Sequence, residues 1–456
     1  MDTLRQPSRL PEGVNKLFLF DVFNITSFTL VMGTPMLLYF KKLGASATVL
    51  SLVAALAFLM NILQIPAANF VERIGYRTFV LRGWTTRTFF VLLMAAVAFI
   101  PQWIDNTTRI CFMLFLLFCY NTSRGISVCG FMPWITQLIP EKMRGKFVSL
   151  DQIYITITTV VITALVAIYF YFFKNPSHFT PIFFLSFLSA LVSLTFLRQV
   201  PDAPVPEIVK NREPVPWLAI FNHPPFKRLL AYNFIVNSAV SVGAVFYITF
   251  LRDVHQASDS MILILNVIAG SVSVLSLFYF GKMLDRVGNL PFLFLGNFLL
   301  FAHFGIWCAI AARLIPLNLW TLGLLQLTTG FGSSFFNMAN VRLSMGVVPE
   351  MGRSHFFALL SVCNSLTLGL VPIFWGLVID ILQPWHAQIG PWHWNAYSLL
   401  YSILALTMVG AFLALYDIQD KQSITTRAFV KELFVVSPYN AISRLRNWIR
   451  IDSNKS

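Results

Sequence analysis

The chain has 456 residues, of which 57% are hydrophobic and only 11% are charged, and its formal net charge is +14. A soluble domain carries about 25% charged residues, so the composition excludes soluble domains and predicts a surface that mostly meets lipid. Because cytoplasmic loops of membrane proteins collect Lys and Arg, the basic balance needs no nucleic acid as a partner.

Apolar runs of about 20 residues, the length that a helix needs to cross a bilayer, recur along the whole chain. The twelve predicted spans are 17–40, 46–68, 79–100, 109–134, 149–173, 181–197, 228–251, 259–280, 290–312, 317–341, 355–381 and 395–416. Placing both termini in the cytoplasm puts most Lys and Arg in the inner segments. The sequence therefore predicts an all-α, multi-pass protein of a plasma membrane or a bacterial inner membrane.

The longest internal hydrophilic segment, 198–227, is rich in proline and charge, which predicts an extended cytoplasmic linker. It divides the chain into an N-terminal six-helix bundle, 1–197, and a C-terminal six-helix bundle, 228–416. In the remaining segment, 417–456, apolar residues alternate with Arg and Lys. This pattern predicts a basic amphipathic tail on the inner lipid surface, and a disordered basic end is the alternative.

A short charged pattern recurs in the two halves. The sequence "ERIG" at 72–75 ends the second predicted span, and "DRVG" at 285–288 follows the eighth, 213 residues later. Likewise, "PEKMR" at 140–144 matches "PEMGR" at 349–353. Positive charge on inner loops explains the arginines but not the acid, the glycine and their recurrence. Two pairs at nearly one offset indicate duplicated halves.

With these repeats and twelve spans, the sequence resembles the major facilitator superfamily, whose loop motif is Gly-x-x-x-Asp-Arg-x-Gly-Arg-Arg. The first copy departs from this motif at Ala68, Glu72 and Tyr76. The resemblance implies that two six-helix bundles expose a central site to each side of the membrane in turn. It also implies a gating role for the loop residues. The gating candidates are Glu72, Arg73, Gly75, Arg77, Arg144, Gly281, Asp285, Arg286, Gly288 and Arg353.

A second, local resemblance covers "PWITQLIPEKMRGKFVSLDQ", from Pro133 to Gln152. This stretch is similar to the sugar-porter pattern Pro…Pro-x-x-x-Arg-Gly-Lys-x-Val-Ser-x-x-Gln. The glutamine of the fifth span binds sugar in that family, which implies a substrate-binding role for Gln152.

Ionised side chains inside a bilayer cost about 2.5–3.5 kcal/mol each, so those within spans should face a cavity or a partner. Asp21 in the first span and Arg124 in the fourth lie at similar predicted depths. We expect them to pair, with Asp21 as a proton-coupling residue, and a purely structural ion pair is the alternative. Asp151 is a third proton-coupling candidate. Asp380 is expected at a solvated helix end.

Uncharged polar side chains within the spans predict a substrate cavity. The candidates are Asn24, Asn121, Gln152, Tyr154, Asn233, Asn237, Tyr247, Asn266, Asn337, Asn340 and Asn364. Gln326 belongs to the same set of polar groups, and His303 is expected to be buried with its hydrogen bonds satisfied. The asparagines gather in the second half, where a neutral, hydrogen-bonding site fits a polyol or a glycoside.

The sequence therefore predicts a secondary active transporter of a small organic solute, coupled to a proton or another ion, that works as a monomer in the bilayer. Exporter of lipophilic compounds is one alternative, and a membrane sensor that does not transport is another. Since nucleophile motifs and nucleotide-binding loops are missing from the sequence, we expect neither an enzyme nor a cofactor. The five cysteines form no CxxC pair, so we expect no metal site.

Overall fold

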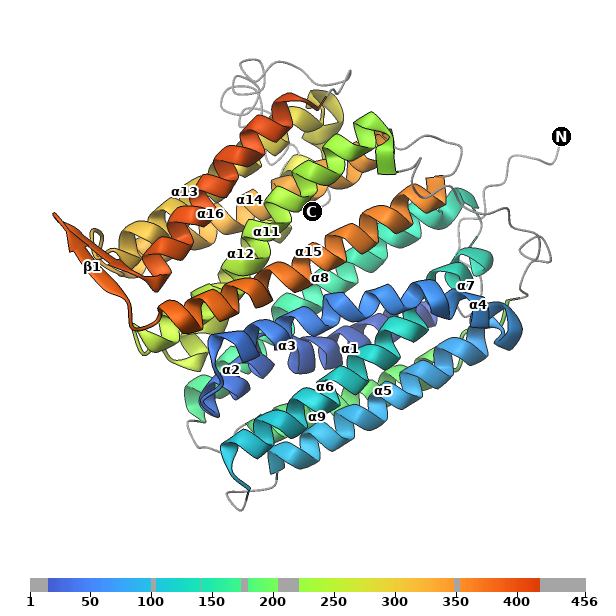
Figure 1. Ribbon diagram of the computed structural model, residues 1–456. Helices are drawn as coiled ribbons and strands as arrows, with labels where there is room; N and C mark the ends of the chain where they lie inside the picture. Colours follow the sequence, from blue (N-terminus) through green and yellow to red (C-terminus); the bar gives the residue numbers. More distant parts are fainter. Residues whose placement is uncertain are drawn as a thin grey trace, which may run out of the picture.

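The computed structural model describes the backbone of residues 15–99, 104–139, 141–173, 179–203, 221–347 and 353–418. Within these ranges, eleven helical segments are long and apolar enough to cross a membrane. The protein is a multi-pass integral membrane protein whose fold consists of two six-helix bundles (Figure 1). The predicted fold class is confirmed.

The first six predicted spans form the N-terminal bundle. Its helices are α1 (Asn15–Met32), α2 (Thr34–Lys42), α3 (Ala47–Leu59), α4 (Gln64–Ile74), α5 (Tyr76–Phe99), α6 (Asn106–Val128), α7 (Phe131–Leu138), α8 (Glu141–Phe172) and α9 (Phe179–Leu197), with the 3-10 turn η1 (Met60–Leu63) after α3. The first span is broken at Gly33, and Pro35 lies in the first turn of α2, where no helix bond needs its missing N–H. The first, second and fourth predicted spans each consist of more than one helical segment, and none of the three is a single continuous α-helix.

The last six predicted spans form the C-terminal bundle. Its helices are α11 (Pro224–Asp253), α12 (Asp259–Val287), α13 (Asn289–Ala311), α14 (Leu319–Val347), α15 (Arg353–Leu382) and α16 (Ala396–Tyr416). Eleven of the twelve predicted spans correspond to the segments that are apolar enough to cross a membrane, and the span 317–341 does not. It lies in the 29-residue helix α14, where Gln326, Asn337 and Asn340 interrupt the apolar sequence.

The repeated motif adopts the same backbone conformation in both halves. Gly75 has a φ of 86° and Gly288 a φ of 88°, and each lies between two helices, α4–α5 and α12–α13. Glycine enters this left-handed region without the strain of a Cβ atom, so it can turn the chain sharply after a helix. The two equivalent turns agree with duplicated halves.

The gating contacts themselves stay a prediction. The side chains of Glu72, Arg144, Asp285, Arg286 and Arg353 lie outside the described residues. Two further candidates have a described placement: Gly281 lies near the end of α12, and the side chain of Arg73 is exposed.

Arg77 is the gating candidate whose contact is described. Its Nη2 donates to the carbonyl oxygen of Arg198 at 2.6 Å, just after the end of α9. A cation at this place satisfies a carbonyl that the helix leaves unpaired and complements the negative end of the helix dipole.

The bundles meet along two helix pairs, α3 with α15 and α8 with α12, which lie side by side in the middle of Figure 1. Two glycines of α15 make the first contact close. A Cβ atom on Gly376 would lie 2.8 Å from Ser51 Oγ, and one on Gly369 would lie 2.5 Å from Leu59 Cδ2. At Gly376 the added atom would also lie 2.8 Å from the backbone Cα of Thr48, so a larger residue there would push α3 and α15 apart, whereas at Gly369 the side chain of Leu59 would have to move.

Charged groups join the bundles at the ends that the predicted topology places outside, which we call the outer ends. Asp380 of α15 accepts hydrogen bonds from the backbone N–H groups of Ala47 and Thr48 at 3.0 and 2.9 Å, and from Thr48 Oγ1. Lys41 forms an ion pair with Asp253 of α11 at 2.7 Å. The expectation that Asp380 is merely a solvated helix end was wrong, because it caps the first turn of α3 in the other bundle.

A β-hairpin that the sequence did not predict connects α15 to α16. Strands β1 (His386–Ile389) and β2 (Trp392–Asn395) pair antiparallel, and Gly390 turns the chain with a φ of 60°. In Figure 1 the hairpin runs across the outer ends of the helices. The side-chain amide of Asn395 donates to the carbonyl oxygen of Ala311 at 2.7 Å, which holds the hairpin against the end of α13.

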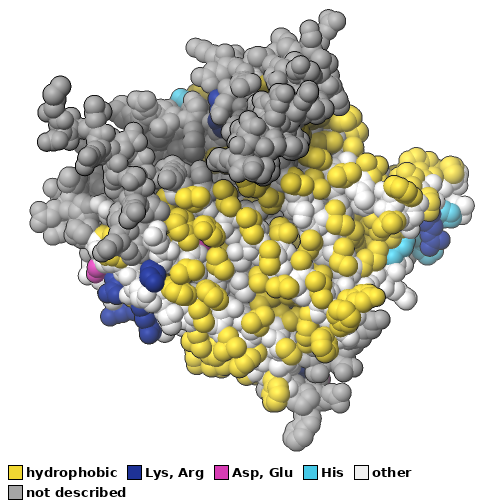
Figure 2. All heavy atoms as spheres, turned by 180° about the vertical axis from the view of Figure 1, so that it is seen from behind, with side chains coloured by type: hydrophobic (Ala, Val, Ile, Leu, Met, Phe, Trp, Pro, Cys, Tyr) yellow, Lys and Arg dark blue, Asp and Glu magenta, His cyan; other side chains and the backbone are white. Residues whose placement is uncertain are grey.

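The outer surface of the helices is apolar. Figure 2 shows hydrophobic side chains over the broad middle of one face, with Lys, Arg and His side chains toward its edges. Such a band is the surface that hydrocarbon covers, and the charged edges are suited to the headgroup layers.

Candidate functional site

Two carboxyl groups meet inside the N-terminal bundle. Asp21 lies on α1 and is 7% exposed, and its carboxyl lies close enough to the carboxyl of Asp151 on α8 for their charges to interact. The Oδ1 atom of Asp151 is buried and has no N–H or O–H donor among the described residues. Two ionised carboxylates that share a buried site repel each other, so the state in which both are charged is disfavoured. A proton on one of the two carboxyl groups relieves this repulsion.

Arg87 of α5 is a buried cation in the neighbourhood of Asp21. It is 7% exposed, its Nη2 donates to Asn24 Oδ1, and its guanidinium lies over the ring of Trp84, 4.1 Å from the ring centre. An amide acceptor and an aromatic face compensate a buried guanidinium without neutralising it. The positive charge thus stays available to Asp21.

Arg124 does not pair with Asp21, which corrects the expectation drawn from their depths. Its Nη1 donates to the carbonyl oxygen of Ala57 at 3.0 Å and to Asn61 Oδ1 at 3.4 Å. Its guanidinium lies 5.2 Å from the ring centre of Phe28. The side chains of Asp21 and Arg124 lie at similar predicted depths but point in different directions, because Arg124 faces the end of α3 and Asp21 faces α8.

The remaining candidates of the N-terminal bundle are not gathered in one place. Asn121 is fully buried on α6 and donates to the carbonyl oxygen of Leu117 at 2.8 Å, while its own Oδ1 has no donor among the described residues. Tyr154 is exposed and stacks on Phe18 of α1 at 5.1 Å. The side chain of Gln152 lies outside the described residues.

Most candidates of the C-terminal bundle pair with one another. Asn233 and Asn340 each donate to the other's Oδ1, at 3.0 and 2.7 Å. Asn237 donates to Asn364 Oδ1 at 3.2 Å. Asn337 alone is exposed. These bonds link α11 to α14 and α15, so the amides hold the helices together as much as they line a site.

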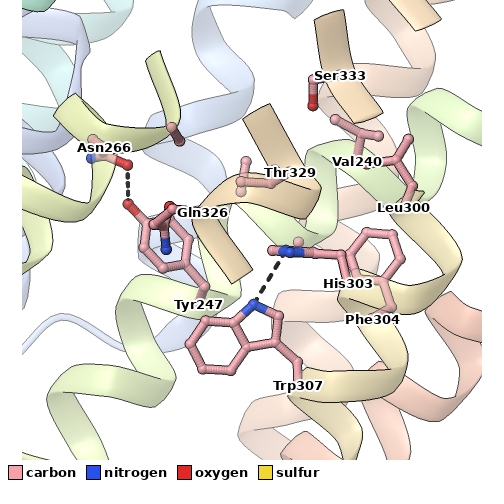
Figure 3. Close-up of a pocket in the computed structure, with 13 residues that line it drawn as sticks. Val240, Tyr247, Asn266, Leu300, His303, Phe304, Trp307, Gln326, Thr329 and Ser333 are labelled. Atoms are coloured by element: carbon pink, nitrogen blue, oxygen red, sulfur yellow. Dashed lines mark hydrogen bonds between the residues drawn. The ribbon is translucent and has the colours of Figure 1, made fainter. Parts of the chain in front are cut away.

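A second polar pair links the two bundles. Tyr247 donates to Asn266 Oδ1, and Asn266 Nδ2 donates to Thr34 Oγ1 at 2.8 Å. Because Thr34 opens α2, this chain of hydrogen bonds connects α11 and α12 of one bundle with the first span of the other. It forms one edge of the cavity in Figure 3.

A cavity of about 180 Å³ lies among α11, α12, α13 and α14. Its polar lining consists of Tyr247, Asn266, His303, Gln326, Thr329 and Ser333, and its apolar lining includes Leu300, Phe304 and Trp307. Of the thirteen lining residues, His303 is the only one whose side chain can become charged near neutral pH.

His303 and Trp307 form one wall of this cavity (Figure 3). Trp307 Nε1 donates to His303 Nε2 at 3.2 Å, which makes Nε2 an acceptor. His303 Nδ1 then carries the proton and lies 3.1 Å from the carbonyl oxygen of Leu325. The predicted buried, satisfied histidine is confirmed, and it is neutral in this arrangement.

Gln326 is the most buried of three polar lining residues, with Thr329 and Ser333, that have no side-chain hydrogen bond among the described residues. It is 4% exposed on α14, yet its side-chain amide has no hydrogen-bond partner among the described residues. A buried amide without partners costs about 1–3 kcal/mol, so water or a ligand should fill its place. In the sequence Gln326 is one polar residue among many, and only its burial beside the cavity distinguishes it.

Two related helix bundles with polar groups buried between and within them are typical of membrane transporters. A family model of the Major Facilitator Superfamily matches residues 17–313 and 251–450 of this chain. The protein therefore belongs to the Major Facilitator Superfamily, and it is a transporter rather than an enzyme.

Solved structures share this fold at low sequence identity. The D-xylose-proton symporter superposes with a TM-score of 0.70 at 15% identity, covering 90% of this chain and 98% of its own. The nucleoside transporter NupG, as a point variant, gives 0.69 at 13% identity, covering 90% and 100%. A bacterial homologue of the human lysosomal transporter Spinster gives 0.62 at 15% identity, covering 92% and 97%. No curated protein matches the sequence significantly.

Proposed function

We propose that the protein is a proton-coupled secondary transporter of a small, neutral, hydroxyl-bearing organic solute such as a sugar or a glycoside. The buried carboxyl pair of Asp21 and Asp151 carries the proposal, because a proton on one of the two groups removes the repulsion between two carboxylates inside the membrane. Release of that proton would leave two negative charges together and beside Arg87. Proton binding and bundle movement would therefore be linked.

The cavity of the C-terminal bundle supports a neutral solute. Its amide, hydroxyl and imidazole groups offer both donors and acceptors, and its lining has no fixed charge to bind an ion. The unpartnered amide of Gln326 matches a hydroxyl group, which can donate and accept at once.

Uptake into proteoliposomes tests this function. The purified protein should accumulate at least one labelled compound from a panel of pentoses, hexoses, glycosides and nucleosides when the vesicle lumen is alkaline. Collapse of the pH gradient with a protonophore should reduce accumulation to equilibration. Transport that ignores the gradient would contradict proton coupling, and transport confined to lipophilic cations would favour an exporter.

A further inference from the structure

A lateral groove opens toward the hydrocarbon where α8 of one bundle packs against α12 of the other. Its volume is about 210 Å³, and its lining is almost entirely apolar. It lies between Ala164, Ala167 and Ile168 of α8 and Ser260, Ile264 and Val267 of α12. The groove is separate from the polar cavity of the C-terminal bundle, with which it shares no lining residue.

Small residues create the hollow. Ser260 Oγ donates to the carbonyl oxygen of Ala167 at 2.9 Å, which brings the two helices together at the floor of the groove. Ala164 fills little of the space beside this contact. Ile168 and Ile264, which are 55% and 45% exposed, form the walls. Close backbone approach through small residues is common between helices in membranes.

The surroundings of the groove determine what can occupy it. Both helices are membrane spans, from Ile153 to Phe172 and from Asp259 to Gly281, so the groove opens at the depth of lipid tails. From Ala164 to Phe172 it extends about 12 Å along α8, close to the ~15 Å that one leaflet contributes to the core. The exposed ring of Tyr171 lies near its outer end, where interfacial tyrosines are favoured.

We propose that this groove binds one acyl chain of a membrane lipid, which contacts both bundles at once. The hollow is almost entirely apolar, since Ser260 Oγ already donates to Ala167 and the hydroxyl-bearing Tyr171 lies at its outer end, and an apolar chain fits its length and depth. Because one wall belongs to each bundle, any movement of α8 relative to α12 changes the groove. Lipid binding and the position of the bundles are therefore thermodynamically linked, each shifting the other.

Photo-crosslinking of the full chain in nanodiscs tests the site. The probe is a phosphatidylcholine with a diazirine in the middle of one acyl chain, and the adducts are mapped by mass spectrometry. We expect adducts to concentrate on Ile168 and Ile264, in both helices. The substitutions Ala164→Phe and Val267→Phe fill the groove from opposite bundles, and each should reduce these adducts at least fivefold.

Leu165→Phe is the matched control. Leu165 follows Ala164 on the same helix, is 56% exposed and does not line the groove. This substitution should leave the adducts on Ile168 and Ile264 unchanged. Even labelling along all lipid-facing positions, labelling of one helix only, or adducts that survive both filling substitutions would overturn the proposal. Each filling substitution is read separately, so one that prevents folding leaves the other as the test.

Discussion

The two bundles share one fold but bury different chemistry. The N-terminal bundle holds Asp21, Arg87 and Arg124 in its interior, with Asp151 at its inner side. In the described part of the C-terminal bundle, charged side chains lie near helix ends, and the interior holds amides, hydroxyls and one neutral histidine. Under the proposed function, one half responds to protons and the other recognises a neutral solute.

This difference has a physical basis. A buried group that gains or loses a proton changes the field around it, and a low-dielectric interior transmits that change far. Amide pairs such as Asn233–Asn340 keep their charge at any pH and give fixed, directional contacts. Placing the two kinds of group in separate bundles lets proton binding act through bundle movement without disturbing the solute contacts.

The largest effect is expected from the carboxyl pair. Asp21→Asn keeps the size and the polarity of the side chain but can neither bind nor release a proton. Accumulation driven by a pH gradient should therefore fall to background, whereas exchange of labelled for unlabelled solute should continue. Both rates can be measured in the same proteoliposomes. If Asp21→Asn still accumulates solute against a gradient, the acidic half does not couple transport to protons.

A smaller, solute-specific effect is expected from Gln326→Leu. The substitution keeps the size of the side chain and removes its amide, so a solute hydroxyl would lose about 1–2 kcal/mol of hydrogen bonding. The apparent affinity should fall about tenfold, while the dependence on the pH gradient is retained. Gln137→Leu, at an exposed position of α7, serves as the control. Equal losses of affinity from the two substitutions would show that the cavity does not recognise the solute.

A loss of stability is expected when one member of the reciprocal pair Asn233–Asn340 is replaced. Asn340→Leu leaves the Oδ1 atom of the buried Asn233 without its donor and should lower the free energy of unfolding by about 1–2 kcal/mol, although Asn233 Nδ2 still donates to the carbonyl oxygen of Leu229. Replacing both asparagines by leucine should recover part of this loss, because no polar group is then stranded. Unfolding in mixed micelles measures the difference. A double variant less stable than either single one would point to a role beyond packing.

The smallest effect is expected at the outer ends, where the C-terminal bundle does carry charge. Asp380→Ala removes the acceptor that α15 supplies to the first turn of α3, while the helix's own N-cap residue Ser46 remains, and should weaken the closed outer end by about 0.5–2 kcal/mol. A cysteine at Ser51, which is fully buried against Gly376, should then react several-fold faster with an impermeant maleimide. The reaction is measured in a background without the native cysteines.

Asp105→Ala is the matched control for this cap. Asp105 accepts from the backbone N–H of Thr108 at 3.0 Å, so it caps α6 within a single bundle. Its removal should leave the reactivity of the cysteine at Ser51 unchanged. A similar increase from both substitutions would mean general loosening instead of opening between the bundles.

The spans and the duplicated turns could be predicted from the sequence because each depends on local chemistry. Long apolar runs form helices in lipid, and Gly75 and Gly288 each permit a conformation that other residues resist. The pairing of Asp21 with Arg124 could not be predicted correctly, because depth along a helix says nothing about the direction of a side chain around it.

Contacts between distant segments were also beyond the sequence. Asp380 and Ala47 are 333 positions apart, and nothing near either residue indicates the other. The importance of Gln326 depends on what its amide lacks, which only the packing around it reveals. The polar residues were thus identifiable as a set, but their individual partners followed from the arrangement of the helices.

The cap of α3 makes opening of the outer end a hydration event. As α15 moves away, the N–H groups of Ala47 and Thr48 lose the Asp380 carboxylate and need new acceptors at once. Water molecules are the acceptors at hand, and they also solvate the freed carboxylate. The ease of opening should therefore follow water activity, so that osmolytes excluded from the protein surface keep the outer end closed.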